Sequence, residues 1–233
     1  MPYKNINIPF SKNKKIFFVG ATGSGKTEIA LNYACLLAKH LNKKIYLMDL
    51  DMIKPYFRLR NVKKEFCKNN VEIITPGGKL DYVDFPGITP DMVSSVMDGS
   101  LSLVADAGGD DVGARIIGRF SHILRSIGAD FYYVYNGMRP YPRGESDTLE
   151  IMSAIEAAGR FKLTGIVHNS HLMGESGVSI LKENIEKVNL IAVLKGIPVI
   201  MHCIREDMYE DASKEITDIS IMPLKLFLMP KWL

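Results

Sequence analysis

The residues best suited to chemistry lie near the start of the chain, where Gly20 to Thr27 match G-x-x-x-x-G-K-[ST], the pattern of a phosphate-binding loop. Glycines let such a loop curl until its N–H groups and the N-terminus of the next helix face an anion. Lys26 would reach the β- and γ-phosphates of a nucleotide and act in catalysis, and Thr27 would bind Mg²⁺. The expected nucleotide-contacting residues are Gly20, Gly23, Ser24, Gly25, Lys26, Thr27 and Glu28.

The segments around this loop have the order that a phosphate site needs. The apolar run Ile16 to Val19 predicts a buried strand, and Glu28 to Leu41 predicts a helix. A helix that starts at the loop adds its dipole to the anion site. The alternative is a glycine-rich turn that binds nothing, and the flanking strand and helix favour the phosphate site over it.

Acidic residues follow two further predicted strands. The strand KIYLMDL leads to Asp49 and Asp51, and the strand LSLVA runs into Asp106 and Asp110. Open α/β sheets bind ligands at strand ends, and Mg²⁺ prefers oxygen ligands. We therefore expect Asp106 to hold Mg²⁺ through a water molecule, with a helix cap or turn former as its alternative role. The remaining acids, Asp49, Asp51 and Asp110, are available to orient an attacking water.

The rest of the chain alternates predicted strands with predicted helices. Such alternation implies a mainly parallel, twisted sheet covered on both faces, which is the three-layer α/β/α fold of P-loop NTPases. No internal repeat or low-complexity linker divides residues 1–233, so one domain is expected, with its core over about 15–204. Further strands are expected over 71–75, 131–135, 163–168 and 197–204, helices over 56–68, 91–97, 112–127, 146–159 and 178–194, and a loop-rich connection over 79–90.

The composition is that of an ordinary soluble protein, since 47% of the 233 residues are hydrophobic and 24% are charged. The formal net charge of +3, without a long basic block, gives no reason to expect nucleic acid as a partner. The three cysteines lack C-x-x-C spacing, and no segment resembles a signal peptide or a membrane span. A cytoplasmic protein is therefore expected.

Taken together, the three motifs resemble those of the MinD/ParA class of P-loop ATPases, within the SIMIBI group and the CobQ/CobB/MinD/ParA nucleotide-binding domain family. The resemblance rests on Gly20 to Thr27, Asp49 to Asp51 and Asp106 to Asp110, and it extends over about residues 15–204. The class includes the nitrogenase iron protein and the nickel-insertion ATPase of carbon monoxide dehydrogenase. The resemblance implies that ATP and Mg²⁺ are the ligands. It also implies slow hydrolysis that resets a conformational switch for a protein client.

The resemblance also implies roles for individual acids. Asp49 and Asp51 would lie in switch I, near Mg²⁺ and the attacking water, and Asp106 to Asp110 would form switch II. Asp51 or Asp110 would orient the water for catalysis. The metal-binding residues would be Thr27, Asp49 and Asp106.

Two further positions bear on the nucleotide base and on assembly. Asn169, at the end of the predicted strand GIVHN, matches the adenine-reading asparagine of the class, with a strand-end turn residue as the alternative. Ala21 stands where the class carries a lysine that reaches the partner's nucleotide across a dimer. The sequence therefore leaves open whether a nucleotide-sandwich homodimer forms.

Two other functions also remain open. One is an ATP-dependent small-molecule kinase or ligase of the dethiobiotin synthetase kind, which a deep pocket beside the γ-phosphate, lined by residues 79–90 and Arg139, would favour. The other is a nucleotide-dependent interaction module that does not hydrolyse. The apolar tail 221–233 resembles a membrane-surface anchor, but Pro223 and Pro230 oppose an amphipathic helix there. We expect this tail to pack on the domain's own surface.

Overall fold

A parallel sheet forms the centre of the computed structural model, which describes residues 8, 10–11, 15–51, 70–75, 88–170 and 177–228. The sheet has eight strands in the order β3-β2-β4-β1-β5-β6-β7-β8, and every neighbouring pair is parallel. The strands are β1 (Lys15–Val19), β2 (Ile45–Leu50), β3 (Val71–Ile74), β4 (Leu103–Ala107), β5 (Asp130–Tyr135), β6 (Gly165–Asn169), β7 (Val199–Arg205) and β8 (Ile221–Leu224).

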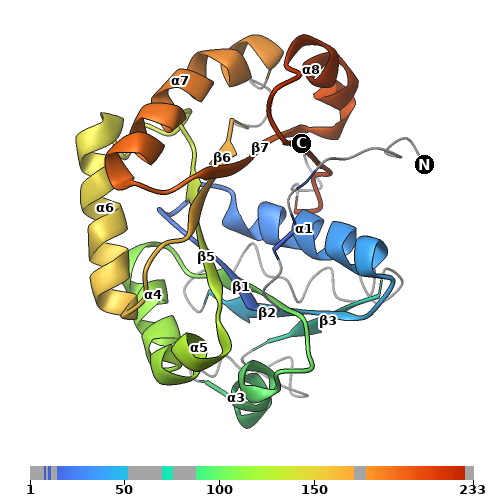
Figure 1. Ribbon diagram of the computed structural model, residues 1–233, viewed down its shortest axis with the longest axis vertical. Coiled ribbons are helices and arrows are strands. Elements are labelled where there is room, and N and C mark those ends of the chain that lie inside the picture. The colour runs from blue at the N-terminus through green and yellow to red at the C-terminus, as the bar shows by residue number, and fades with distance from the viewer. Residues whose placement is uncertain are drawn as a thin grey trace.

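Helices cover both faces of this sheet. Figure 1 shows α1 on one face and α4, α5 and α6 on the opposite face. The described helices are α1 (Lys26–Leu41), α3 (Pro90–Met97), α4 (Asp110–Gly118), α5 (Ser121–Ile127), α6 (Gly144–Gly159), α7 (Val178–Lys195), α8 (Tyr209–Glu215) and the short 3₁₀ helix η4 (Glu206–Met208). The three-layer α/β/α architecture predicted from the alternating pattern is confirmed.

The alternation of side chains along β1 shows how the two layers of the core are built. Phe18 belongs to the cluster that packs with α1, whereas Phe17 belongs to the cluster on the other face, with residues of α4 and α6. On that second face the ring of Phe131 stacks between Phe17, at a centroid distance of 5.2 Å, and Phe161, at 4.0 Å. A strand buried on both faces reads as a continuous apolar run, as this one does.

Asp106 lies inside a strand, whereas the sequence predicted a position just past the strand end. Strand β4 continues to Ala107, so Asp106 pairs in register with Phe18 of β1 and Asp49 of β2. Asn169 is the last residue of β6, at the end of the strand GIVHN as expected. Pairing between strands that are distant in sequence sets these boundaries, and a local hydrophobic run does not contain that information.

The helix expected over 112–127 is in fact two helices. Helix α4 ends at Gly118, and α5 begins at Ser121. A Cβ added to Gly118 would lie 2.9 Å from the carbonyl oxygen of Ala158 in α6, so the two backbones meet at the break. The N-cap of α4 is Gly109.

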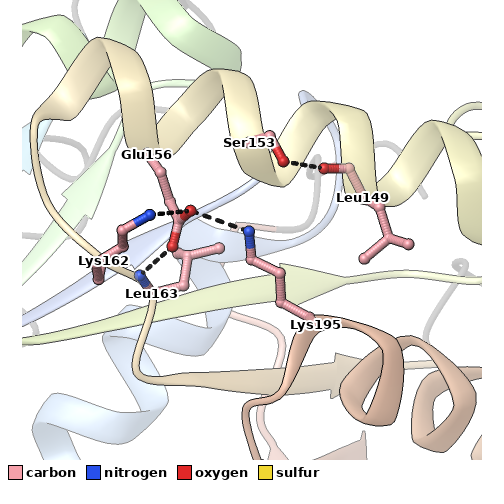
Figure 2. A network of polar contacts seen from close by, with 6 residues as sticks. All are labelled: Leu149, Ser153, Glu156, Lys162, Leu163 and Lys195. Carbon is pink, nitrogen blue, oxygen red and sulfur yellow. Dashed lines mark hydrogen bonds and ion pairs between the residues drawn. The ribbon is translucent and has the colours of Figure 1, made fainter.

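Helix α6 is joined to α7 through Glu156 (Figure 2). Its carboxylate accepts hydrogen bonds from the ammonium groups of Lys195 at 3.0 Å and Lys162 at 3.2 Å, and from the N–H of Leu163 at 2.9 Å. Burial raises the pKa of Glu156, but these three hydrogen bonds outweigh it and hold the pKa below its usual value. The network therefore links α6 to the C-terminal end of α7 and to the segment that precedes β6.

The C-terminal part of the described chain extends the sheet beyond the last strand predicted from sequence. Strand β8 pairs with β7 at the sheet edge and contains Pro223, a position that an edge strand tolerates because one side of its backbone needs no partner. Residues 225–228 then continue over α1, while 229–233 lie outside the described residues. The helix expected over 56–68 and most of the loop expected over 79–90 also lie outside them.

Candidate nucleotide-binding site

The loop Gly20 to Thr27 connects β1 to α1 and has the backbone conformation that its glycines predict. Gly20, Gly23 and Gly25 have φ angles of 142°, 79° and 95°, values that side-chain-bearing residues rarely adopt. Gly25 is the N-cap of α1, so the helix begins at Lys26. A Cβ added to Gly20 would lie 2.8 Å from the carbonyl oxygen of Val134, which shows that the loop starts in contact with β5.

The lysine of the loop is folded into its centre. The Lys26 ammonium group donates hydrogen bonds to the carbonyl oxygens of Gly20 at 2.9 Å and Ala21 at 2.8 Å, and the side chain is buried. A buried ammonium group needs such acceptors, because desolvation of a charge is costly. Its position places a positive charge at the N-terminus of α1, where the helix dipole already favours an anion.

Two carboxylates predicted to bind Mg²⁺ lie next to each other. Asp49 and Asp106 are register partners on β2 and β4, and both are buried. In each strand the residue two positions earlier, Leu47 or Val104, belongs to the core cluster of α1, and side chains alternate along a strand. Asp49 and Asp106 therefore share the face covered by α1, the helix that begins with Lys26 and carries Thr27 next to it.

The turn after β4 meets both the loop and the end of β2. A Cβ added to Gly109 would lie 2.1 Å from Oγ1 of Thr22, and one added to Gly108 would lie 3.4 Å from Oδ1 of Asp51. The N–H of Asp51 in turn donates to Oδ1 of Asp49 at 3.0 Å. Asp110, the other candidate for orienting a water, begins α4 directly after this turn. The three motifs predicted from sequence are thus assembled at one edge of the sheet.

Asn169 is in contact with the same loop. Its side-chain amide donates a hydrogen bond to the carbonyl oxygen of Ser24 at 2.7 Å, and the residue is 2% exposed. A Cβ added to Gly25 would lie 2.2 Å from that amide nitrogen, so only glycine leaves room for this contact. The structure places Asn169 beside the loop, while its role in reading a base remains a prediction.

Glu28 has a contact that sequence reasoning did not anticipate. Its carboxylate accepts hydrogen bonds from the N–H groups of Phe227, at 3.1 Å, and Leu228, at 2.6 Å. One turn further along α1, the side chain of Asn32 exchanges two hydrogen bonds of 2.9 Å with the backbone of Lys225. Burial raises the pKa of Glu28 to about 7, although the two N–H groups act in the opposite direction. We call residues 225–228 the C-terminal strap.

A cavity of about 470 Å³ adjoins the outer side of the loop. It reaches from Ala21 and Thr22 to Arg139, and the first turn of α4 contributes Asp111. The side chain of Arg139 comes from the connection after β5, and its Cζ lies 3.4 Å from where a Cβ on Gly23 would be. Residues 88–90, the described part of the predicted 79–90 loop, are not among the lining residues of this cavity.

Comparisons with known proteins bear on the fold. No protein-family model matches the chain, and no curated protein matches its sequence. Among solved structures, FtsY from Mycoplasma mycoides aligns with a TM-score of 0.56 and 17% identity, over 86% of this chain and 63% of that one. FlhF in complex with GTP and Mg²⁺ aligns with a TM-score of 0.53 and 15% identity, over 82% of this chain and 66% of that one.

Signal recognition particle 54 kDa protein from Aeropyrum pernix, in complex with GDP, aligns with a TM-score of 0.52 and 13% identity. This chain is covered over 86% of its length and that chain over 43%. The chain therefore spans less than two thirds of the length of the FtsY and signal recognition particle structures named here. At these identities the likeness shows the fold, which is that of P-loop NTPases, and the MinD/ParA class remains a prediction.

Proposed function

We propose that the chain binds a Mg²⁺-nucleoside triphosphate at Gly20 to Thr27 and hydrolyses it slowly, as a conformational switch for a protein client. The observation that carries this proposal is the placement of Asp49 and Asp106 together on the face of the sheet covered by α1. A phosphate loop with a buried lysine on the same edge supplies the anion site. The pairing of an anion site with two adjacent carboxylates is what a Mg²⁺-nucleotide requires.

The residues fit Mg²⁺ chemically. Thr27, Asp49 and Asp106 offer hydroxyl and carboxylate oxygens, which are the ligands that Mg²⁺ prefers, directly or through water. Bound there, the ion would neutralise negative charge that develops on the phosphates during hydrolysis. The chain's own part is to hold the triphosphate with loop N–H groups and Lys26, and to orient water with Asp51 or Asp110.

The turn at Gly108 and Gly109 supports the switch part of the proposal. It touches Thr22 of the loop on one side and Asp51 on the other, and α4 starts directly after it. A γ-phosphate beside Thr22 would therefore meet the N-terminus of α4, and its loss on hydrolysis would remove that interaction.

ATP is the proposed nucleotide, on the resemblance of Asn169 to the adenine-reading asparagine of the MinD/ParA class. Guanine nucleotides are the alternative, because the similar structures of FlhF and of the signal recognition particle protein hold GTP with Mg²⁺ and GDP. Calorimetry in which ATP and GTP compete for the wild-type chain measures which nucleotide binds more tightly.

A second candidate function is phosphoryl transfer to a small molecule. It is favoured by the cavity of about 470 Å³ beside Ala21, Thr22 and Arg139, because an acceptor bound there would lie next to the loop that holds the phosphates. In that case the purified chain alone would release no phosphate, and adding an acceptor would produce the nucleoside diphosphate together with the phosphorylated acceptor. Nucleotide binding without any turnover, even with partner proteins present, would instead support an interaction module.

The direct test compares wild type with Lys26→Ala by calorimetry with Mg·ATP and Mg·GTP, and by phosphate release. We expect the variant to lose at least about 100-fold in affinity, because it removes the buried cation from the loop. Lys39→Ala, an exposed lysine near the other end of α1, is the matched control and should bind like wild type. Wild-type affinity in Lys26→Ala would overturn the proposal.

A further inference from the structure

The connection after β5 is held to the sheet edge by Asn136. Its side-chain oxygen accepts a hydrogen bond from the N–H of Met138 at 3.0 Å, and its carbonyl oxygen accepts one from the N–H of Arg139 at 3.3 Å. Asn136 itself is buried directly after β5, which is paired with β1. The backbone of Arg139 is therefore fixed relative to the strand that leads into the phosphate loop.

From this anchored backbone the Arg139 side chain lies along the outer side of the loop. Its Cζ and Nε would lie 3.4 and 3.5 Å from a Cβ added to Gly23, whose φ angle is 79°. A side chain at position 23 would thus meet both backbone strain and the guanidinium group. Arg139 also lines the cavity that includes Ala21 and Thr22, on the side where the Gly109 turn contacts Thr22.

The charge of Arg139 is not neutralised by an acid in the described part of the chain. The acidic residue that shares its cavity, Asp111, is paired with Arg115 of the same helix at 2.5 Å. Arg139 is exposed and forms no ion pair within the described ranges. An exposed guanidinium group without an ion-pair partner, next to this loop, is suited to bind phosphate oxygens, because it can donate two hydrogen bonds to them at once.

We propose that Arg139 is a catalytic residue supplied in cis, whose guanidinium group contacts the γ-phosphate oxygens during hydrolysis. In the reaction, a bond forms between water oxygen and the γ-phosphorus while the bond from that phosphorus to the β–γ bridging oxygen breaks. The products are the nucleoside diphosphate and inorganic phosphate, and a proton from the water is released or kept by the phosphate according to pH. Arg139 stabilises the charge that the equatorial oxygens carry in the transition state, as an arginine finger does.

This inference rests on the proposed hydrolysis, and the test separates the two. Phosphate release at saturating nucleotide is measured for wild type, Arg139→Ala, Arg139→Lys and Arg143→Ala. Arg143, at the N-cap of α6 on the same connection, is the matched control, because its N–H group bonds to Asp147 and it does not line the cavity. Calorimetry then compares binding of the nucleoside diphosphate alone with binding of the diphosphate plus aluminium fluoride, which imitates the transferring phosphoryl group.

The expected result is a fall in kcat of about 1,000-fold in Arg139→Ala, with diphosphate affinity within about threefold of wild type. The same variant should lose the extra affinity that aluminium fluoride confers, Arg139→Lys should keep part of it, and Arg143→Ala should behave as wild type. A hydrolysing wild type with kcat for Arg139→Ala within about threefold would overturn this inference alone. A wild-type chain that binds no nucleotide would overturn the proposed function and the inference with it.

Discussion

The side-chain amide of Asn169 donates a hydrogen bond of 2.7 Å to the carbonyl oxygen of Ser24, across 145 positions of sequence. Both residues are buried, and the contact ties the end of β6 to the middle of the phosphate loop. Removing one partner of a buried hydrogen bond leaves the other with its desolvation cost. The geometry of the loop therefore depends on a strand that does not border β1.

Replacing Asn169 should weaken both the fold and the nucleotide site. We expect Asn169→Ala to lower the free energy of unfolding by about 1–3 kcal/mol, measured by urea denaturation, and to weaken nucleotide binding about tenfold. Asn169→Asp should cost more, since it places a carboxylate oxygen against the Ser24 carbonyl. The exposed Asn189 of α7 provides a control through Asn189→Ala. Unchanged stability in Asn169→Ala would contradict the role of this contact.

Alanine substitutions at two glycines with positive φ angles should distinguish the cost of backbone strain from the cost of a steric clash. A Cβ at Gly196, with φ 75°, meets nothing within 4 Å, whereas a Cβ at Gly25, with φ 95°, meets the Asn169 amide nitrogen at 2.2 Å. Gly196→Ala should cost about 1 kcal/mol of strain, and Gly25→Ala about 3 kcal/mol because the conflict adds to it. Urea midpoints of the two variants measure the difference. Equal losses would show that the loop relaxes without cost.

The burial of the Glu28 carboxylate makes stability depend on pH. The pKa of Glu28 is about 7 in the folded chain against an ordinary value of 4.5, so the folded state binds the proton more tightly. Its contribution to stability is therefore fully present below about pH 4.5 and is lost as the pH rises to about 7. The loss amounts to about 3 kcal/mol at most, because one pKa unit corresponds to about 1.4 kcal/mol.

Glu28→Gln should flatten the stability profile between about pH 4.5 and 7, because glutamine does not titrate. Urea denaturation at several pH values measures this, with Glu150→Gln on the exposed side of α6 as the control. A variant with the same pH slope as wild type would show that another group is responsible.

The two lysines that contact Glu156 differ in exposure and should differ in how much they stabilise the fold (Figure 2). The side chain of Lys195 is 15% exposed and that of Lys162 is 85% exposed, while Glu156 is 10% exposed. Exposed ion pairs contribute about 0–1 kcal/mol, and buried ones cost more to break. Lys195→Met should therefore destabilise the fold by about 2 kcal/mol and Lys162→Met by less than about 0.5 kcal/mol. Thermal unfolding of both variants tests this order, and the reverse order would refute it.

The strands and helices around the site were largely predictable, because their patterns are local. The run Ile16 to Val19 and the pattern of Gly20 to Thr27 are continuous in sequence, and the structure has β1 and α1 at those places. Boundaries set by distant partners were not predictable in the same way. The strand position of Asp106 depends on pairing with Phe18 and Asp49, and the break after Gly118 depends on contact with α6.

The candidate site likewise contains residues that the local sequence predicts and residues that only the tertiary structure brings to it. The candidate phosphate-binding residues follow from the sequence by itself, because Gly20 to Thr27 match a pattern that is continuous in sequence. The φ angles of Gly20, Gly23 and Gly25 are ones that glycine adopts without strain. Which other side chains reach that loop was decided by the tertiary structure. The strand order β2-β4-β1-β5-β6 brings Asp49, Asp106, Arg139 and Asn169 to one sheet edge, and the strap reaches Glu28 from the far end of the described chain. Strands distant in sequence become neighbours only through pairing, and no local pattern records that order.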